Sequence, residues 1–500
     1  MKKYDVVILG GGISGSLFAL NLIKKKKSLS ILILDKERQS KPKVGEATAD
    51  LSSIFLNRLG IKHLLSEQTK KTGLRFIFNE QNSSDKKDVL EFASPSFKTF
   101  ANGYHLNRSV FDSKLLLECE KKGVTVFRPI ELNSANFKSN KCILKVSCNG
   151  VNSEIESCWF IDASGRFRYI KKKFNWADKK ISLNTGAISA HFTNLSAPSN
   201  WDREDSPYWL KNAIGSKSYA TTHFLKQNSW WWLIKIDEFT SSIGTVYDKN
   251  KISVSDPEAY FLESIKKDTI LCKVIKNSNR SKINHLDSLP YICTKMHQNN
   301  VAVLGDANAF IDPLFSPGLE ITSQQNEHLV FLLLDYFKNN KKNTIAWKKY
   351  EDKFLKAYLD RSFVYSHLYQ FMHSYDLFSN ATQLLFFGYQ TFAVLPLKYF
   401  PTIMKNPLRF YKVDRWLFKT IFLRYNKIAI NRNNNNRKSS SLKQPISYSG
   451  INIPKGFYIL FKPIHLGLIW LYNYIKIEST EIYFLIKRIF LFLILFDFIN

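Results

Sequence analysis

The stretch GGGISG, Gly10–Gly15, constrains this chain most, because it stands between an apolar run and a helical pattern. The run before it, YDVVIL, is typical of a short buried strand, and ISGSLFALNLIKK has helical spacing. Glycine permits a tight turn at Gly10, a close approach of the backbone to a pyrophosphate at Gly12, and close helix–strand packing at Gly15. Asp35 ends the next apolar run, LSILILD, where a carboxylate can accept hydrogen bonds from a ribose. The stretch therefore predicts an α/β fold that binds a dinucleotide.

Two later strand ends extend this pattern. FIDASGR, Phe160–Arg166, and VAVLGDA, Val301–Ala307, are apolar runs that each end in a turn containing an aspartate. The three segments, in this order, resemble the FAD-dependent monooxygenase superfamily with a hydroxybenzoate-hydroxylase-type fold. In that family the aspartate matching Asp306 holds the ribityl chain of FAD, and the arginine matching Arg108, in NRSVFDSKLL, approaches the flavin. The chain has no second G-x-G-x-x-G, so we expect electrons from a transient nicotinamide or a separate flavin reductase.

The order of patterns along the chain predicts an α/β fold class. We expect a Rossmann-like FAD-binding domain with an interleaved antiparallel-sheet substrate domain and a helical C-terminal region. The predicted parts are an FAD-binding domain (1–180 and 285–335), a sheet-rich substrate domain (181–284), a helical region (336–430), a low-complexity linker (431–445) and an apolar amphipathic tail (446–500). The linker, NRNNNNRKSSSLKQP, is polar and repetitive, as flexible connections are.

Charge and the C-terminal tail leave the partners of the chain open. The net charge of +30 fits either lysine-rich solvated faces or an anionic partner, such as an acidic carrier protein or a membrane surface. No nucleic-acid module is present. Charged residues and a proline interrupt the tail, so no run reaches the ~20 apolar residues of a spanning helix. We expect either a membrane-surface helical pair or a lid packed on the body of a cytoplasmic protein. The six cysteines show neither CxxC pairing nor a ligand-like cluster, which predicts reduced thiols and no metal site.

Three further stretches narrow the resemblance to the flavin-dependent halogenases of the phenol and pyrrole type. KVGEAT, Lys43–Thr48, resembles their V-G-E-[SA]-T turn. WWWLIKI, Trp230–Ile236, resembles their W-x-W-x-I-P motif with Lys235 in place of the proline, and SSIGTV resembles the S-x-G-x-V strand that follows. GDANAFIDPLFSPG resembles their segment G-D-A-x-x-F-x-D-P-x-x-S-x-G. The resemblance covers roughly Lys3 to Leu333, so the tail lies outside it.

This resemblance implies a reaction and a catalytic lysine. In that family reduced FAD and O₂ oxidise a halide, and the resulting hypohalous acid passes along a tunnel to a lysine. The lysine lies beside an electron-rich aromatic or heteroaromatic substrate, and tethering of that substrate to an acidic carrier protein stays open. The matching residue is Lys71 in KKTGLRFIFN, whose role requires that burial lowers its pKa. Trp230 and Trp232 fall on one side of a strand and Trp231 on the other, so the pair can either line a tunnel or pack in the core.

The resemblance also implies which residues bind the flavin, the halide and the substrate. The expected FAD-binding residues are Gly10, Gly12, Ser14, Gly15, Asp35, Glu46, Ala47, Arg108, Asp162, Gly165, Asp306, Pro313, Gly318 and Leu319. The expected tunnel or substrate residues are Trp230, Trp232 and Phe315, and Ser316 and Gly318 are expected at the halide.

Two departures from the family pattern keep alternatives open. Tryptophan halogenases carry a glutamate where this chain has Phe315, so free tryptophan is not the expected substrate. The halide of the family rests against N–H groups of the S-x-G turn, and Pro317 removes one of them. A charge-assisted hydrogen bond contributes about 1.5–3 kcal/mol, which corresponds to about ten- to a hundredfold in halide affinity. Proline also suits the first position of a helix. A hydroxylase or dehydrogenase of the same fold, without halide use, is therefore the alternative, and a docking protein with degenerate chemistry is a third hypothesis.

Overall fold

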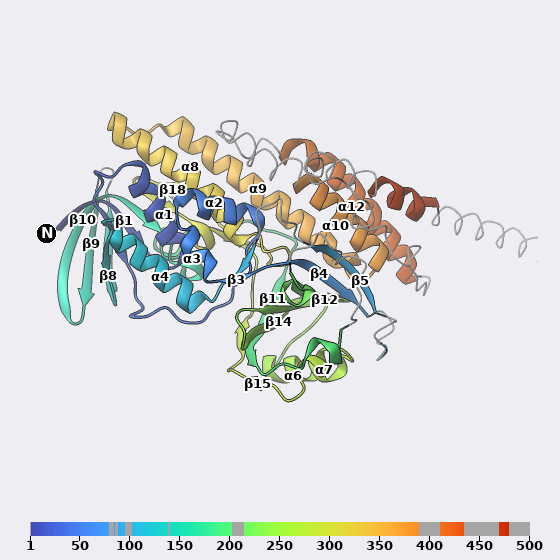
Figure 1. The fold of residues 1–500 in the computed structure, drawn as a ribbon. Helices are drawn as coiled ribbons and strands as arrows, with labels where there is room; N and C mark the ends of the chain where they lie inside the picture. Colours follow the sequence, from blue (N-terminus) through green and yellow to red (C-terminus); the bar gives the residue numbers. More distant parts are fainter. Residues whose placement is uncertain are drawn as a thin grey trace, which may run out of the picture.

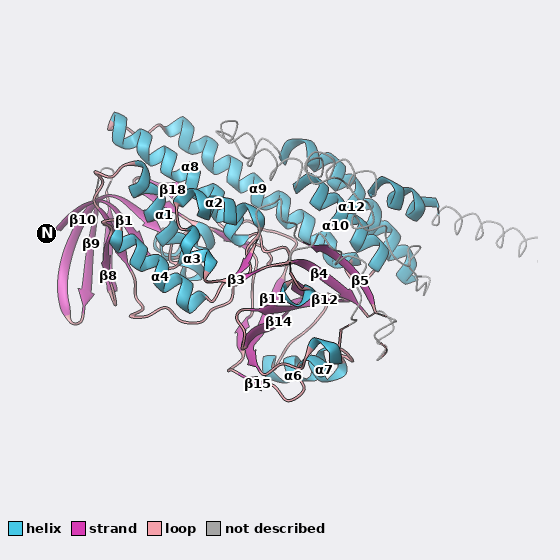
Figure 2. Ribbon diagram, in the orientation of Figure 1, coloured by secondary structure: helices cyan, strands magenta, loops and turns pink. Residues whose placement is uncertain are grey.

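The computed structural model describes residues 2–79, 85, 89–95, 103–138, 141–202, 215–389, 411–434 and 470–479. Within these ranges the chain forms two large sheets, two small ones and a layer of long helices (Figure 1). Figure 2 shows that the long helices lie together on one side, whereas the strands divide into two separate groups. The α/β fold class predicted from the sequence is confirmed.

The first sheet is the one that the glycine fingerprint predicts. Its order is β18 (His297–Gln298), β19 (Val301–Val303), β10 (Val151–Asp162), β1 (Lys2–Leu9), β2 (Ile31–Leu34) and β7 (Thr125–Phe127). β19, β10, β1, β2 and β7 run parallel, and the antiparallel strands β9 (Cys142–Cys148) and β8 (Glu131–Phe137) continue from the first half of β10. Parallel strands end at one edge, so the turns at Gly10, Asp35, Asp162 and Gly305 meet there.

Helices cover this sheet. α1 (Ile13–Lys25) is buried without interruption from Gly15 to Ile23 and contacts α4 (Arg108–Lys121), α2 (Asp50–Leu59) and α8 (Gly318–Asn339). Two short helices also belong to this part of the chain: α3 (Lys62–Ser66) contacts α4, and α5 (Tyr169–Lys173) comes shortly after β10 in the sequence. A helix buried on nearly all sides is mostly apolar, and in SLFALNLI the two buried polar residues are hydrogen-bonded, Ser16 to Gly11 O and Asn21 to Asn326 of α8.

The second sheet is ordered β15 (Asn279–Arg280), β11 (Thr185–Thr193), β14 (Thr240–Asp248), β13 (Ser229–Lys235), β12 (Thr221–Lys226), β4 (Gly73–Phe78) and β5 (Leu90–Pro95), with β16 (Asn284–Leu286) also on β11. The sequence analysis places residues 73–95 in the FAD-binding domain, whereas β4 pairs in parallel with β12 and β5 forms the outer edge. The physical reason is burial, because Phe76, Ile77 and Phe78 need cover on both faces of β4.

The two faces of the second sheet have different neighbours. α6 (Pro257–Lys267) and α7 (Leu271–Val274) cover one face, where Ile77, Trp231 and Phe261 share an apolar cluster. On the other face Phe76, Trp230 and Trp232 belong to the main core. Two short pairs, β3 (Thr69–Lys70) with β6 (Tyr104–His105) and β17 (Tyr291–Ile292) with β20 (Ala309–Phe310), lie in the connections between the sheets.

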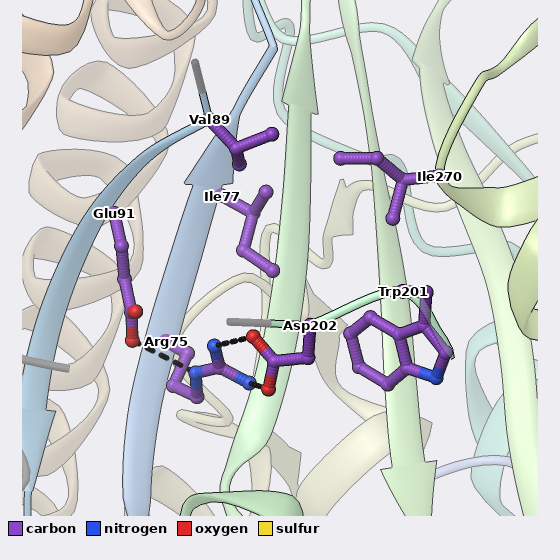
Figure 3. A pocket seen from close by; sticks show the side chains of 7 residues that line it. All are labelled: Arg75, Ile77, Val89, Glu91, Trp201, Asp202 and Ile270. Atoms are coloured by element: carbon purple, nitrogen blue, oxygen red, sulfur yellow. Dashed lines mark hydrogen bonds and ion pairs between the residues drawn. The ribbon is translucent and has the colours of Figure 1, made fainter. Parts of the chain in front are cut away.

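Arg75 fixes the outer edge of the second sheet (Figure 3). Its guanidinium is 1% exposed and donates from Nε to Glu91 Oε1 at 2.8 Å, and from Nη1 and Nη2 to the Asp202 carboxylate at 3.0 and 2.9 Å. Burial disfavours the charged form, but the two carboxylates raise the pKa of Arg75 above its usual value. Arg75 thus joins β4, β5 and the segment after β11 through buried ion pairs.

The helical layer spans both sheets. α9 (Thr344–Phe371) stacks Trp347 on Trp159 of the first sheet at 4.8 Å and carries Tyr369 to Trp230 of the second sheet. α10 (Tyr375–Tyr389) and α12 (Tyr411–Asn434) pack beside it. The end of α12 corrects the linker prediction, because residues 431–434 are helical. Arg432 faces inward, is 5% exposed and binds both oxygens of Asp376 at 3.0 Å.

Part of the C-terminal tail is docked on this layer. Residues 470–479 form a helix in which Asn473 donates to Gln383 of α10 at 3.1 Å and Glu478 accepts from Arg424 of α12 at 2.7 and 2.9 Å. This portion fits the lid hypothesis. Residues 435–469 and 480–500, which hold the rest of the predicted linker and tail, lie outside the described residues. Among the helices that the structure describes, none is both long enough and apolar enough to cross a membrane.

Candidate active site

The glycine turn after β1 is closed tightly by its neighbours. Gly10 has a φ of +111°, and its N–H donates to Leu34 O of β2 at 2.8 Å. A Cβ on Gly10 would lie 2.4 Å from Ala163 O, and a Cβ on Gly15 would lie 2.0 Å from Gly10 O. Neither position has room for a side chain, so the two glycines are required by the packing of β10 and α1 on the turn.

The start of α1 is suited to a pyrophosphate. Gly12 caps the helix without any side-chain hydrogen bond, and the first turn carries no acidic residue. A Cβ on Gly12 would find only Lys43 Nζ at 3.7 Å and Asp112 Oδ2 at 3.9 Å within 4 Å, so the missing side chain leaves open space. A helix N-terminus with unoccupied N–H groups and a lysine beside it attracts an anion. These residues fit the diphosphate of FAD.

The carboxylate predicted at the ribose lies against the same turn. A Cβ on Gly11 would come within 2.8 Å of Asp35 Oδ2, so the second glycine of the run makes room for Asp35. Burial raises the pKa of Asp35, and a hydrogen bond from the Glu37 N–H and the charge of Lys43 lower it. Ser14 lies on the opposite side of the turn, where its Oγ would be 2.7 Å from a Cβ on Gly305.

Arg108 is held by an aspartate that the sequence analysis quotes but does not assign. Arg108 donates from Nε and Nη2 to the two oxygens of buried Asp112 at 2.8 and 3.0 Å, and from Nη1 to Gly45 O at 3.0 Å. Lys43 Nζ also lies 2.8 Å from Asp112. Burial alone would raise the pKa of Asp112, but Arg108 and Lys43 hold it below its usual value. Asp112 therefore orients two cations beside the glycine turn.

Glu46 links the loop of the KVGEAT motif to the second sheet. His191 of β11 lies 2.5 Å from Glu46 Oε1, and this hydrogen bond raises the pKa of His191. Glu46 is 2% exposed, and its Oε2 has no partner in the described part of the chain. Ala47 bridges to His105 of β6, as an extension of the β3–β6 ladder. A buried oxygen without a partner is the expected state of a group that faces a ligand, so Glu46 also fits a flavin site.

The two other aspartates predicted at the flavin differ in their surroundings. Asp162 accepts hydrogen bonds from the N–H groups of Ser164 and Ile170 at 2.9 and 2.7 Å, so its carboxylate shapes the turn that contains Gly165. Within the described residues, no backbone N–H donates to the Asp306 carboxylate. Burial raises its pKa, and the charges of Arg166 and Arg108 lower it. Asp306 is therefore the better placed of the two to meet a ligand.

Lys71 is buried behind the KVGEAT loop. Its side chain is 5% exposed, its Nζ donates to Thr48 O at 3.3 Å, and its N–H donates to Gly103 O at 3.0 Å. Burial lowers the pKa of Lys71 to about 8, and the charge of Asp50 opposes this shift. An amine with this pKa exists partly in its neutral, nucleophilic form near neutral pH.

Two buried histidines face the same region. His105 lies between Lys235 O and Thr221 Oγ1, each at 2.9 Å, and His223 Nδ1 lies 2.9 Å from Arg75 O. Burial, together with the charge of Lys71, lowers the pKa of both histidines to about 3. Both imidazoles are thus neutral, and Lys71 is the cation among them.

The tryptophans follow the predicted alternation. Trp230 and Trp232 lie on the main-core face with ring centroids 5.9 Å apart, and Trp231 packs on Phe261 at 5.0 Å on the opposite face. Trp230 is joined to the lysine region through His223, whose ring is 5.5 Å from Trp230 and 4.6 Å from Phe76.

Phe315 lies in an aromatic cluster rather than in a polar site. Its ring centroid is 6.0 Å from those of Phe76, Tyr365 and Phe386, which come from β4, α9 and α10. Phe378 of α10 adds a further contact to Phe76 at 5.3 Å. The position at which tryptophan halogenases carry a glutamate is therefore surrounded by rings.

The turn from Asp312 to Gly318 forms the start of α8. Leu314 N–H donates to Asp312 Oδ1 at 3.0 Å, and Ser316 N–H donates to Pro313 O at 2.9 Å. Ser316 has a φ of +56°. The sequence analysis places Pro317 at the first position of the helix, whereas it is the cap and α8 begins at Gly318. The missing N–H costs nothing at either position. A Cβ on Gly318 would meet nothing within 4 Å, so there is open space at the start of α8.

Several residues of this region escape the sequence analysis. Asp112 lies in NRSVFDSKLL and Asp312 in GDANAFIDPLFSPG, so the family motifs could have identified both as site residues. His105, His191, His223 and Tyr369 carry no motif, because strand and helix packing alone brings them to the site.

The comparisons with known proteins agree with this geometry. The family model described as tryptophan halogenase matches residues 5–84 and 77–376. The chain is 26% identical over 368 residues to 1H-pyrrole-2-carbonyl-[peptidyl-carrier protein] chlorinase of Pseudomonas fluorescens, covering 70% of this chain and 79% of that protein. It is 26% identical over 378 residues to the flavin-dependent halogenase chlA of Dictyostelium discoideum, covering 67% and 60%. The crystal structure of halogenase PltM with phloroglucinol and FAD superposes with a TM-score of 0.74 at 19% identity, over 95% and 96% of the two chains.

Proposed function

This chain belongs to the tryptophan halogenase family, and we propose that it halogenates an electron-rich aromatic or heteroaromatic ring that an acidic carrier protein holds. It is an FAD-dependent oxidoreductase of the flavin-dependent halogenase type. The family name does not fix the substrate, because Phe315 stands where tryptophan halogenases carry a glutamate and is surrounded by aromatic rings.

The observation that carries the proposal is the state of Lys71. The lysine is buried, its pKa is about 8, and two neutral histidines lie around it. As an ammonium it can donate a hydrogen bond to hypohalous acid. As a neutral amine it can take up the halogen, forming an N–halogen bond while water leaves with the oxygen. Either role requires a dry site, and the burial of Lys71 supplies one.

The residues of the first sheet would hold FAD. Gly12 and the start of α1 suit the diphosphate, Asp35 the ribose, and Arg108, Glu46 and Asp306 the region near the ring system. When bound and reduced, FAD supplies the electrons with which O₂ and a halide yield hypohalous acid. The chain's own contribution is to hold Lys71 behind the KVGEAT loop, where its Nζ donates to Thr48 O, and to exclude water from the lysine.

A carrier-bound substrate is supported by charge and by likeness. The chlorinase of Pseudomonas fluorescens acts, by its name, on a pyrrole-2-carbonyl group borne by a peptidyl-carrier protein. A net charge of +30 favours association with an acidic domain, because opposite charges raise the encounter rate. We infer that the ring enters toward the aromatic cluster of Phe76, Phe315 and Phe386 while the carrier stays at the surface.

The test compares free and carrier-bound rings. Wild-type protein receives FAD, a flavin reductase, NADH, O₂ and bromide, with 4-hydroxybenzoate and pyrrole-2-carboxylate offered free or as carrier thioesters, and products are identified by mass. Bromination of the thioesters, lost in Lys71→Met and kept in Lys70→Met, is the expected result. Lys70 is the matched control because it neighbours Lys71 but is exposed. Hydroxylated products without bromine would refute the halogenase assignment, and equal bromination of free rings would refute the carrier.

A second candidate is a hydroxylase or dehydrogenase of the same fold without halide use. One observation favours it: Ser316 N–H is already bound to Pro313 O, and Pro317 has no N–H, so the turn offers few halide donors. Pro317→Ser restores an N–H at a residue whose φ of −77° suits serine. If halide use is limited by that donor, the variant should lower the bromide KM about tenfold. An unchanged KM would show that the missing N–H does not matter.

A further inference from the structure

A chain of buried hydrogen bonds joins the tryptophan strand to the turn before α8. Trp230 Nε1 of β13 donates to Tyr369 Oη of α9 at 2.9 Å, and Tyr369 donates to Asp312 Oδ2 at 2.8 Å. The other oxygen of Asp312 accepts from Leu314 N–H at 3.0 Å. Strand β13, helix α9 and the turn before α8 are thus joined by one line of hydrogen bonds, although they lie far apart in the sequence.

Every member of this line is withdrawn from water. Trp230, Tyr369 and Asp312 are 1%, 2% and 1% exposed. In the described part of the chain, Asp312 pairs with no cation and is held only by neutral donors. A buried carboxyl group without a cation is costly, so the two hydrogen bonds that Asp312 accepts determine the orientation of its side chain.

Burial and these hydrogen bonds also influence the charge state of Asp312. Burial raises the pKa of Asp312 to about 7, although the hydrogen bonds from Tyr369 and Leu314 oppose this shift. The other titratable or charged groups around the line are Tyr365 of α9, His223 of β12 at the Leu314 backbone, Asp248 of β14 near Tyr369, and Arg361 and Glu320 near Tyr365. None of them is a cation in direct contact with the carboxyl group.

We propose that Tyr369, held by Trp230, is a positioning residue that orients Asp312 and through it the Asp312–Ser316 turn, where the halide and the flavin meet the start of α8. Asp312 fixes Leu314 N–H, Pro313 O fixes Ser316 N–H, and α8 begins two residues later at Gly318. On this basis Trp230 acts through its indole N–H on the turn, in addition to any contact that its ring makes along a tunnel. The inference rests on the proposed halide chemistry of this site.

Bromide binding to the FAD-loaded protein tests the proposal. The change in the visible absorption of FAD is recorded as bromide is added, between pH 5.5 and 9. Tyr369→Phe removes the hydroxyl and leaves Asp312 with one donor, so bromide affinity at pH 7 should fall about tenfold or more. Because the lost hydrogen bond favours the carboxylate, the pH midpoint of the bromide response should rise.

Two more variants separate positioning from general damage. Trp230→Phe keeps the Tyr369–Asp312 bond and should give a smaller change in the same direction, about threefold, and it serves if Tyr369→Phe does not fold. Trp231→Phe, on the opposite face of β13, should change neither the affinity nor the midpoint. A lower melting temperature of Tyr369→Phe with unchanged affinity and midpoint would overturn the proposal, since that is the result of a purely structural role.

The same titration distinguishes the two levels of inference. If the absorption of FAD in the wild type does not respond to bromide, the halogenase assignment fails. In that case the positioning role of Tyr369 is tested by the pH dependence of the FAD absorption without bromide. A midpoint shifted by Tyr369→Phe would support the positioning role. An unshifted midpoint would overturn it.

Discussion

Replacing Lys71 with methionine should stabilise the fold while it removes the activity. Burial lowers the pKa of Lys71 from 10.5 to about 8, a gap of about 2.5. Each pH unit corresponds to about 1.36 kcal/mol, so keeping the ammonium in the fold costs about 3 kcal/mol at pH 7. Methionine fills a similar space without charge but gives up the hydrogen bond to Thr48 O, a loss of about 1 kcal/mol. The free energy of unfolding of Lys71→Met should therefore exceed that of the wild type by about 2 kcal/mol.

The pH dependence of this difference identifies its cause. The unfolded chain keeps the Lys71 ammonium up to about pH 10.5, whereas the folded chain releases the proton around pH 8. Between these values the unfolded state binds more protons, so the free energy of unfolding of the wild type rises with pH. The advantage of Lys71→Met should be full below pH 8 and should vanish near pH 10.

Urea unfolding followed by circular dichroism at pH 7 and pH 10 measures both differences, with Lys70→Met as control. Lys70 is exposed, so its replacement should leave the free energy of unfolding within about 0.5 kcal/mol at both pH values. A Lys71→Met variant that is less stable than the wild type at pH 7 would refute the reasoning. So would a gain in stability that does not change with pH, because it would come from packing and not from charge.

Three further changes have expected outcomes. Gly15→Ala would press a Cβ within 2.0 Å of a backbone oxygen in the glycine turn, so FAD should be lost on gel filtration at a concentration that keeps the wild type loaded. Arg432→Leu removes the cation that pairs with buried Asp376 and should lower the free energy of unfolding by about 3–5 kcal/mol in urea, whereas adding Asp376→Asn should recover part of that loss. The contact with Glu46 raises the pKa of His191 in the folded protein. The contribution of this contact to the free energy of unfolding is therefore full below pH 6.5 and is lost as the pH rises through the folded-state pKa. In His191→Gln the melting temperature should depend less on pH across this range.

Local patterns in the sequence predict the part of the site that local geometry builds. The glycine turn, the strand ends at Asp35 and Asp306 and the alternation of Trp230 with Trp231 are all found as expected, because each depends on residues within one strand–turn unit. The family resemblance carried by the motifs is confirmed by the family model over residues 5–84 and 77–376.

Contacts between distant segments could not be predicted in this way. His191 meets Glu46 across 145 residues and Tyr369 meets Asp312 across 57, and no periodicity in the sequence signals either pair. The parallel pairing of β4 with β12 has the same origin, since a buried strand takes whatever neighbour covers it. Arg432 was missed for a different reason: a polar, asparagine-rich composition favours a linker, but a single inward-facing ion pair is enough to continue the helix.

The docked helix of residues 470–479 bears on how this protein can be engineered. It packs on α10 through two hydrogen bonds, from Asn473 to Gln383 and from Asn380 to the Trp470 carbonyl. Phe378 and Phe386 of α10 belong to the aromatic cluster around Phe315. A library directed only at the rings around Phe315 would therefore leave out the helix that packs on α10 and helps to set the positions of Phe378 and Phe386. Substitutions selected for altered substrate range should also arise in the C-terminal helix, and shortened versions of the chain should be compared for selectivity as well as for yield.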